Sequence, residues 1–424
     1  MKCLAGLASI SLSAGLASAG VYSVTDLGPF TNLSGRTDST ANGINNSGEV
    51  SAANVTGGAY RAFLYNGGWT NLGTLGGAES LGNGINDAGQ VVGRSTTTTG
   101  DTHAFVWTAG GTDGVAGNPQ MKDLGTLGGA SSQANGINAS GQIAGDSETA
   151  GGDSHAFVYS GGKLTDIGGL LGNSLPNSFG YGINQAGHIA GTAYNSKYAT
   201  AHAFFYNGST AKDIGGLGGS GASALALNNS DHIVGYASTA NSVDHAFEYA
   251  DGSMTDLGTL GGHYSYAISI NNSNVIVGGS FIDTGDSVYH AFVSDGSSMT
   301  DLNNQLGASG AGWVLVEARG INDLGQIVGT GTYNGANHVF LLTPATATVT
   351  APAIVGVNVE GHDVVLTFTS TSGASYDVQA RSDLSTGSWD TVASAIAGTG
   401  GDVTFTNAGG GTLSERFYRV SASP

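Results

Sequence analysis

The stretch GINDAGQVVG at residues 84–93, followed by HAFVW at residues 103–107 and KDLG at residues 122–125, contains the pattern that decides the fold. Short runs of Val, Ile, Phe and other bulky residues alternate in it with the turn formers Gly, Asn and Asp. The apolar residues do not follow a helical spacing. The stretch therefore predicts four short β-strands joined by turns.

The same pattern recurs seven times, and we number the copies repeats 1 to 7 in chain order. Each copy contains GIN or a weaker variant, then a run such as QVVG, then HAF, which is RAF in the first copy and HVF in the last, and most end in TDLG or a close variant of it. The GIN asparagines, spaced 41 to 52 residues apart, are Asn45, Asn86, Asn138, Asn184, Asn228, Asn271 and Asn322. Four strands in a repeat of this length are typical of a propeller blade. We predict an all-β fold with a seven-bladed β-propeller; a β-solenoid is the alternative, although its rungs are about half as long.

The two ends of the repeat array complement each other. The segment VYSVTDLG at residues 21–28 is an extra copy of the fourth strand, and repeat 7 lacks that strand after HVFLL at residues 338–342. A ring in which the N-terminal strand completes the last blade leaves no strand edge unpaired. We therefore expect closure by the N-terminal strand.

The termini differ from the repeats. Residues 1–19 have one lysine, an apolar run and small residues before a cleavage point after Ala19, which is typical of a secretory signal peptide. The single cysteine, Cys3, lies in that segment. We assign residues 20–344 to the propeller, 345–353 to a Thr/Ala/Pro linker and 354–424 to a small β-sandwich. In the sandwich we expect strands at 363–368, 375–380, 389–393, 402–406 and 416–420.

The charge of the chain limits the classes of partner that it can bind. It has 12 Lys and Arg against 31 Asp and Glu, a formal net charge of −19. Nucleic acids are therefore excluded as partners, because their binding depends on cationic side chains. No apolar run is long enough to cross a bilayer. We expect a secreted, extracellular monomer.

The recurring HAF motif, from HAFVW at His103 to HVFLL at His338, resembles the extracellular HAF-repeat family of bacteria over residues 25–344. The last copy, DLNNQLGASGAGWVLVEARGIND, has the distinctive form of that family. This resemblance implies secretion and a repeat architecture, and it implies no biochemical activity. The C-terminal stretches YDVQARSDLSTGSW and ERFYRV resemble a β-sandwich domain of large secreted bacterial proteins, usually used for adhesion, spacing or sorting.

The repeated His, Asp and Asn residues are interpreted as structural. Equivalent third-strand residues of neighbouring blades would lie on the order of 13 Å apart, given strands about 4.8 Å apart, so the histidines cannot share one metal. We expect each HAF histidine to bond within its own blade or to an adjacent loop, and the GIN asparagines to form turns. No cofactor is predicted. Four aspartates in loops before the histidines are candidate calcium ligands: Asp101, Asp153, Asp244 and Asp286.

The function expected from the sequence is binding without catalysis. HExxH, GxSxG and P-loop motifs are absent, so no catalytic residue is assigned. The longer loops after the fourth and second strands share one face, where aromatic residues that break the repeat gather. These suit stacking on a glycan or docking a protein partner: Phe179, Tyr181, Tyr194, Tyr198, Tyr264, Tyr266, Tyr289 and Trp313. We thus predict a non-catalytic binding or structural protein; the alternative is a polysaccharide-active propeller enzyme, a lyase or glycosidase.

Overall fold

A computed structural model describes residues 22–30, 40–172, 174–195, 200–345, 351–371, 374–383, 388–412 and 415–423. The predicted signal peptide and Cys3 lie outside the described residues. The chain divides into two compact units, one of Ser23–Thr343 and one that contains Pro344–Pro424. The all-β prediction is confirmed: the described helices are the short 3₁₀ turns η1 (Gly168–Leu171), η2 (Leu302–Gln305), η3 (Ala308–Gly310) and η4 (Gly410–Thr412).

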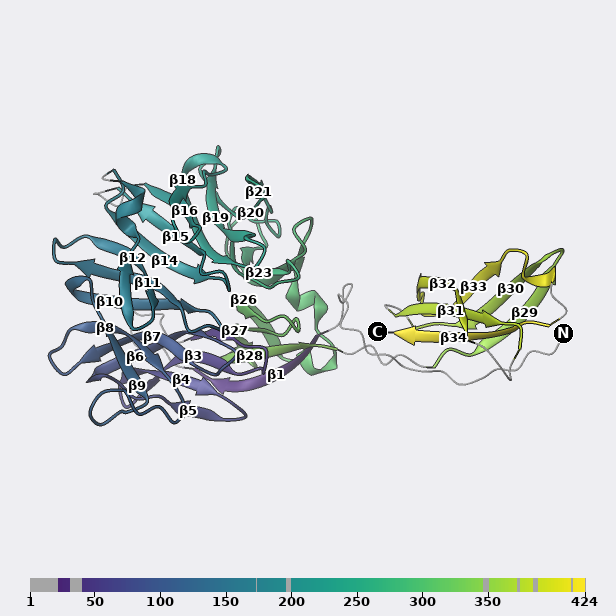
Figure 1. The fold of residues 1–424 in the computed structure, drawn as a ribbon, viewed down its shortest axis with the longest axis horizontal. Coiled ribbons are helices and arrows are strands. Elements are labelled where there is room, and N and C mark those ends of the chain that lie inside the picture. The colour runs from purple at the N-terminus through teal and green to yellow at the C-terminus, as the bar shows by residue number, and fades with distance from the viewer. Residues whose placement is uncertain are drawn as a thin grey trace. The chain divides into compact units, whose positions relative to one another are not determined.

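Each repeat contributes strands in a fixed order, as the motifs predict (Figure 1). The first strands, which contain GI of the GIN motif or its equivalent, are β2 (Thr40–Ile44), β6 (Gly76–Ile85), β10 (Gly128–Ile137), β14 (Asn177–Ile183), β18 (Gly218–Leu227), β22 (Ser265–Ile270) and β26 (Trp313–Ile321). The second strands are β3 (Val50–Thr56), β7 (Val91–Thr97), β11 (Ile143–Thr149), β15 (Ile189–Tyr194), β19 (Ile233–Thr239), β23 (Ile276–Phe281) and β27 (Ile327–Tyr333).

The HAF motifs or their variants form the third strands β4 (Ala59–Tyr65), β8 (Thr102–Trp107), β12 (Ser154–Ser160), β16 (Ala201–Tyr206), β20 (Asp244–Ala250), β24 (Tyr289–Ser294) and β28 (Ala336–Pro344). The fourth strands are β5 (Trp69–Asn71), β9 (Met121–Gly125), β13 (Lys163–Asp166), β17 (Ala211–Asp213), β21 (Ser253–Asp256) and β25 (Met299–Asp301). Repeat 7 has no fourth strand of its own. Its sheet has the order β1-β28-β27-β26, where β1 is Tyr22–Pro29.

Antiparallel pairing joins successive strands within each repeat. Most repeats form separate four-stranded sheets, and a parallel bridge between Ser131 and Thr102 links repeats 2 and 3 into one sheet of eight strands. In the first strand a bulge precedes the GIN motif, as between Ala134 and Gly136. Beside this bulge the two strands lie so close that a Cβ at Gly145 would overlap the carbonyl oxygen of Gln133. This contact explains the glycine that ends the QVVG motif.

The apolar core of the first unit lies between consecutive repeats. One cluster joins Ala62 and Leu64 of repeat 1 to Val91, Phe105 and Trp107 of repeat 2. The HAF phenylalanines fill these spaces and are almost fully buried, because neighbouring sheets pack on both of their faces. Another cluster joins the two ends of the array, since it contains residues of β1, β2, β3, β27 and β28.

The second unit contains two three-stranded sheets. Their orders are β29-β30-β33, with β29 (Ile354–Glu360), β30 (Asp363–Thr369) and β33 (Asp402–Asn407), and β32-β31-β34, with β32 (Asp390–Ala397), β31 (Ser375–Arg381) and β34 (Phe417–Ser423). Residues of both sheets share one apolar core. Five strands lie close to the expected ranges, and β29 was not expected.

Candidate functional site

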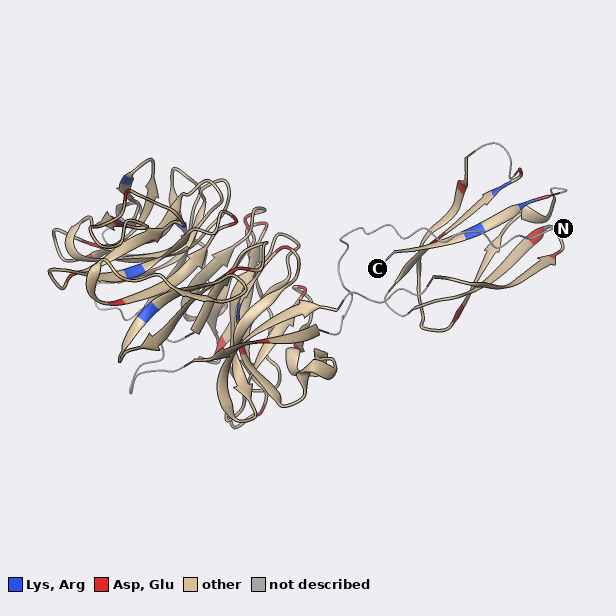
Figure 2. Cartoon of the chain, turned by 90° about the horizontal axis from the view of Figure 1, so that it is seen from below, with Lys and Arg blue, Asp and Glu red and all other residues tan. Residues whose placement is uncertain are grey.

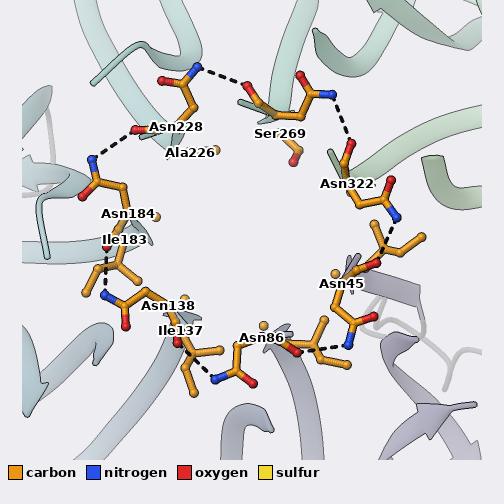
Figure 3. Close-up of a pocket in the computed structure, with 18 of the residues that line it drawn as sticks. Asn45, Asn86, Ile137, Asn138, Ile183, Asn184, Ala226, Asn228, Ser269 and Asn322 are labelled. Carbon is orange, nitrogen blue, oxygen red and sulfur yellow. Dashed lines mark hydrogen bonds between the residues drawn. The ribbon is translucent and has the colours of Figure 1, made fainter. Parts of the chain in front are cut away.

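The GIN asparagines form a ring of hydrogen bonds, which we call the asparagine ring (Figure 3). Each side-chain Nδ2 donates to the backbone oxygen of the equivalent asparagine in the next repeat, at 2.9 to 3.1 Å. The seventh bond runs from Asn322 back to Asn45, 277 residues away. The sequence predicted only the local turns, which are also present: Oδ1 of Asn45 accepts from the amide of Ser47.

The asparagine ring surrounds a cavity of about 300 Å³. Its wall includes all seven GIN motifs or their variants, and it also includes Asn42, Asn83 and Asn135. The ring amides are hydrogen bonded on both sides, to their own turns and to the next repeat. They therefore leave few groups for a ligand, and we interpret them as structural.

The position three residues before each ring asparagine varies, and we call these seven residues the variable tier: Asn42, Asn83, Asn135, Tyr181, Leu225, Ile268 and Arg319. The three asparagines still bond to the next repeat, from Nδ2 to the backbone oxygens of Gly82, Ala134 and Gly180, at 2.7 to 2.9 Å. From repeat 4 onward the tier changes to aromatic, apolar and cationic side chains.

Tyrosines and carboxylates collect around this changed part of the tier, and we call them the tyrosine–carboxylate arc: Asp146, Tyr181, Tyr236, Tyr266, Tyr289 and Glu317. Its members are neighbours from repeat to repeat. The rings of Tyr236 and Tyr266 are 5.0 Å apart, and those of Tyr266 and Tyr289 are 6.5 Å apart. The Tyr289 hydroxyl donates to Glu317 at 3.5 Å. Arg319 Nε lies 2.6 Å from the Glu317 carboxylate. All six side chains are half-buried, so part of each remains exposed.

Burial changes the acid–base properties of the arc. It raises the pKa of Asp146 to about 6, against the opposing effects of a hydrogen bond from Asn135 and the charge of Arg94. Burial also raises the pKa of Tyr266 to about 12 and holds the pKa values of Tyr181 and Tyr289 well above that of a free tyrosine. The hydroxyls therefore stay protonated as hydrogen-bond donors, while Asp146 exchanges its proton near neutral pH.

The expected aromatic residues divide into groups. Tyr181, Tyr266 and Tyr289 belong to the arc. Tyr264 packs on Phe281 with ring centroids 6.2 Å apart, and Phe179 packs on Tyr194 at 5.8 Å.

Trp313 lies elsewhere, on the first strand of repeat 7. It is 8% exposed and stacks on Tyr333 at 5.2 Å. Tyr198 lies outside the described residues.

Four members of this region were not predicted from the sequence: Arg94, Asp146, Tyr236 and Glu317. Three of them occupy the same place in the second strand, directly after its glycine, as VVGR, IAGD and IVGY show. A charged or aromatic residue at one position of an otherwise apolar strand was a signal that alignment of the repeats could have detected.

The HAF histidines bond within their own sheets, as predicted. Each Nδ1 lies 2.7 to 3.0 Å from the aspartate of the adjacent strand. The pairs are His103–Asp123, His155–Asp166, His202–Asp213, His245–Asp256, His290–Asp301 and His338–Asp26. The last pair joins residues 312 apart and fastens β1 to β28.

The four candidate calcium ligands have separate partners. The Asp101 carboxylate accepts from Thr99, that of Asp244 from Ser238 and that of Asp286 from His263, while the backbone oxygen of Asp153 accepts from Thr149. Among the described residues no three His, Cys, Asp or Glu side chains form a group that could hold a metal. Figure 2 shows the acidic residues scattered over the loops and strands, with few Lys or Arg between them.

Comparisons with known proteins show the class of the fold. No family model matches the chain, and no curated protein is significantly similar to it. Similar solved structures include the β-propeller domain of a trilobed protease from Pyrococcus furiosus, with 9% identity, 82% of this chain and 91% of that chain covered, and a TM-score of 0.34. A puromycin-hydrolysing peptidase of Mycobacterium tuberculosis has 12% identity, coverage of 86% and 61%, and a TM-score of 0.43. The chain's own described strands make it all-β, and its solved neighbours are propeller-like.

A gluconolactonase of Xanthomonas campestris is also similar, with 11% identity, coverage of 60% and 82%, and a TM-score of 0.35. These neighbours are hydrolytic enzymes, and they contradict the prediction of a non-catalytic binding or structural protein. At such low identities the similarity concerns the fold alone, so no substrate or reaction is transferred from them. In the described part of the chain no helix is long and apolar enough to span a membrane.

Proposed function

We propose that the first unit is a seven-bladed β-propeller of the HAF-repeat type, closed by β1, that hydrolyses glycosidic bonds at the tyrosine–carboxylate arc. The asparagine ring supports seven blades, because each of its seven bonds joins one repeat to the next. The Asp26–His338 pair and the sheet order β1-β28 support closure. We further propose that residues 1–19 are a signal peptide, which would direct this activity outside the cell, and that the second unit is a β-sandwich module.

The observation that carries the hydrolase proposal is the Asp146 carboxyl with its pKa of about 6. Hydrolysis of a glycoside requires a carboxylic acid that is still protonated under working conditions and a second, ionised carboxylate. We assign the first role to Asp146 and the second to Glu317, which is in ion contact with Arg319; the assignment requires the two carboxyl groups to lie within about 10 Å of each other across the substrate. Asp146 would donate its proton to the leaving oxygen while Glu317 takes a proton from the water that attacks the anomeric carbon.

The tyrosines between these carboxylates support a carbohydrate as substrate. Sugar rings present apolar C–H faces that stack on aromatic rings, and their hydroxyl groups accept hydrogen bonds. The tyrosine hydroxyls of Tyr181, Tyr266 and Tyr289 remain donors because burial raises their pKa values. The arc thus combines stacking surfaces with protonated donors.

A reducing-end assay over a panel of soluble neutral and acidic polysaccharides tests the proposal. We expect the wild-type protein to release reducing ends from at least one of them at pH 5 to 6. Asp146→Asn should lower the rate by a factor on the order of 100 or more, the usual contribution of a general acid. Asp113→Asn is the matched control, because Asp113 is exposed and pairs with Lys122. A wild-type protein that cleaves nothing, or an active Asp146→Asn variant, would contradict the proposal.

A further inference from the structure

One asparagine of the variable tier, Asn135 of repeat 3, contacts the tyrosine–carboxylate arc. Its Nδ2 donates to Oδ1 of Asp146 at 3.1 Å and to the backbone oxygen of Gly180 at 2.9 Å. Its Oδ1 accepts from Nε2 of Gln133 at 2.7 Å and, at the longer distance of 3.4 Å, from Nδ2 of Asn83. The orientation of the amide is fixed, because the backbone oxygen of Gly180 can only accept. Both Nδ2 hydrogens and Oδ1 therefore have partners.

The pairing of β10 with β11 places these side chains together. Gln133 lies directly opposite Asp146, and Asn135 is the extra residue of the bulge between Ala134 and Gly136. The hydrogen bond from Gln133 to Asn135 shows that both side chains lie on the same face of β10 as the carboxyl group that they meet. All three side chains are half-buried, so water competes less with their hydrogen bonds than it would at the surface.

The repeated architecture does not require this arrangement. Repeats 1 and 2 also have a tier asparagine that bonds to the next repeat. At the place of Asp146, however, they have Ala53 and Arg94, whose side chains contain no acceptor, and at the place of Gln133 they have Thr40 and Leu81. Repeats 4 to 7 have no tier asparagine. Among the seven repeats, repeat 3 alone combines a tier asparagine with a carboxyl group.

The hydrogen bond from Asn135 makes the two oxygens of Asp146 unequal. Oδ1 accepts from Nδ2 of Asn135, and within the described part of the chain no hydrogen bond reaches Oδ2. In a protonated carboxyl group the carbonyl oxygen is the better acceptor, and the other oxygen carries the hydrogen. The contact therefore favours the form of the acid in which Oδ1 is the carbonyl oxygen and Oδ2 is the hydroxyl.

We propose that Asn135 is the positioning residue of the general acid: it holds Oδ1 of Asp146, so that Oδ2 carries the proton that is transferred. In that step the O–H bond at Oδ2 breaks and its electron pair stays on the carboxylate. The glycosidic oxygen receives the proton and keeps the electron pair of its broken bond to the anomeric carbon. As charge develops on Asp146, the hydrogen bond from Asn135 becomes charge-assisted and stronger. The transfer rests on the proposed glycoside hydrolysis, whereas the hydrogen bond can be measured without it.

Other groups face Asp146 from the neighbouring elements. Arg94 on β7 carries a positive charge that favours the carboxylate, and Tyr181 on β14 is influenced by the charge of Asp146. On β12 the residue opposite Asp146 is the uncharged Ala156. None of these groups changes in the test variants. Because the bond from Asn135 favours the ionised form, its loss should raise the pKa of Asp146 further.

Titration of the Asp146 carboxyl carbon by NMR, in the full-length protein labelled with ¹³C at aspartate, tests the inference. Asp146→Asn assigns the signal by its disappearance. Asn135→Leu should move the titration to higher pH by about 1 unit, as expected for the loss of one hydrogen bond to a charged group. On a polysaccharide that the protein cleaves, the alkaline limb of kcat should move in the same direction. The value of kcat at pH 5 should fall about tenfold with little change in KM, since the bond acts on the transition state.

Asn42→Leu is the matched control. It removes the same kind of bond to the next repeat, at a tier position where the opposite strand has no carboxyl group. Leucine occupies the tier in repeat 5 as Leu225, so the fold accepts that side chain there. Asn42→Leu should leave the titration of Asp146 and the pH profile unchanged.

Gln133→Leu tests the same hydrogen bond from the other side of the amide, and it copies Leu81 of repeat 2. It removes the closer of the two donors to Oδ1 of Asn135. The titration of Asp146 should therefore shift in the same direction, by a smaller amount. This variant decides the inference if Asn135→Leu does not fold.

The outcomes separate the inference from the proposed function. An unmoved titration in the Asn135 and Gln133 variants, or an equal shift in Asn42→Leu, would overturn the inference. A shift to higher pH in a protein that cleaves nothing would support the role of Asn135 toward Asp146 and contradict the hydrolase. Cleavage with an alkaline limb that does not respond to Asn135→Leu would support the hydrolase and overturn Asn135 as its positioning residue.

Discussion

The asparagine ring and the variable tier lie three residues apart on the same seven strands, yet they follow opposite rules. The ring holds the same residue in every repeat, and each copy makes the same bond to its neighbour. The tier keeps asparagine only at 42, 83 and 135, and then holds Tyr181, Leu225, Ile268 and Arg319. A repeat protein thus shows where its architecture is fixed and where individual repeats are free to differ.

The difference has a physical basis in the hydrogen bonds. A ring asparagine satisfies two part-buried backbone amides of its own turn and one buried backbone oxygen of the next repeat. Few other side chains can replace that set of bonds. A tier asparagine makes one or two bonds to the next repeat, as Asn42 does to Gly82 and Asn83 does to Ala134 and Asn135, and the other repeats pack without it.

The largest effect should follow from deletion of β1, residues 22–29. The deletion leaves the sheet of repeat 7 without its fourth strand. The deletion removes the Asp26–His338 pair and exposes the backbone edge of β28. We expect loss of cooperative unfolding or a fall in melting temperature of more than about 10 °C, with association of the exposed edges. Asp26→Asn alone is the control and should have a much smaller effect in the same calorimetric scan. A deletion variant that melts like the wild type would exclude closure by β1.

Substitutions at the ring position and at the tier position of repeat 4 test directly whether the ring contributes more to stability than the tier. Asn184→Ala removes the bonds to Asn228 and Asp231 and leaves the part-buried amides of Ala186 and His188 without their acceptor. Because each orphaned group costs about 1–3 kcal/mol, the free energy of unfolding should fall by about 2 kcal/mol or more. Tyr181→Leu, which copies Leu225, should change it by less than about 1 kcal/mol. Chemical denaturation measures both, and equal losses would refute the distinction.

Tyr181→Asn makes repeat 4 resemble repeats 1 to 3 at the variable tier. It removes a stacking surface and a hydroxyl donor beside Asp146. We expect turnover to fall about tenfold, equivalent to about 1.4 kcal/mol, with an unchanged melting temperature. Asn83→Tyr, the reverse change on the asparagine side, should leave turnover nearly unchanged in the same assay. If Tyr181→Asn and Asn83→Tyr lose activity equally, activity does not depend on the side of the variable tier that borders the arc.

The pKa of Asp146, about 6, fixes one limb of the pH profile. The protonated acid is the active form, so turnover should be high at pH 5 and about tenfold lower at pH 7.

The raised pKa of Asp146 also affects stability, because the folded state holds this proton more tightly than the unfolded chain does. The contribution of Asp146 to stability therefore falls as the pH rises from about 4 through 6. Asp146→Asn should abolish both dependences in rate and denaturation measurements.

The smallest effect should come from the repeated His–Asp pairs away from β1. Asp213 is 44% exposed and accepts from His202 at the surface. An exposed pair of this kind contributes at most about 0.5 to 1 kcal/mol, so Asp213→Asn should shift the denaturation midpoint only slightly. A larger loss would show that these pairs carry more of the sheet stability than their exposure implies.

Periodicity made most of the fold predictable. The GIN, QVVG, HAF and TDLG motifs marked strands, and the local turns of Asn45 and its equivalents followed from asparagine chemistry. The bonds from each asparagine to the next repeat could not be foreseen, since they depend on how the sheets pack. The arc was only half predicted. Aromatic residues such as Tyr181 stood out against the repeat, but Asp146 gains its properties from burial, which exists only in the folded chain.

The Asp26–His338 pair has a consequence for the order in which the chain can fold. During synthesis at about 5 to 20 residues per second, β1 emerges roughly 15 to 60 s before the strand that it pairs with, 312 residues later. Through that interval its edge has no partner, and each intermediate repeat can build only on its neighbour. Contacts of such long sequence separation also slow folding, because the loop must close before they form. The newborn chain therefore has a long period in which an unpaired β1 is open to chaperones or to other chains.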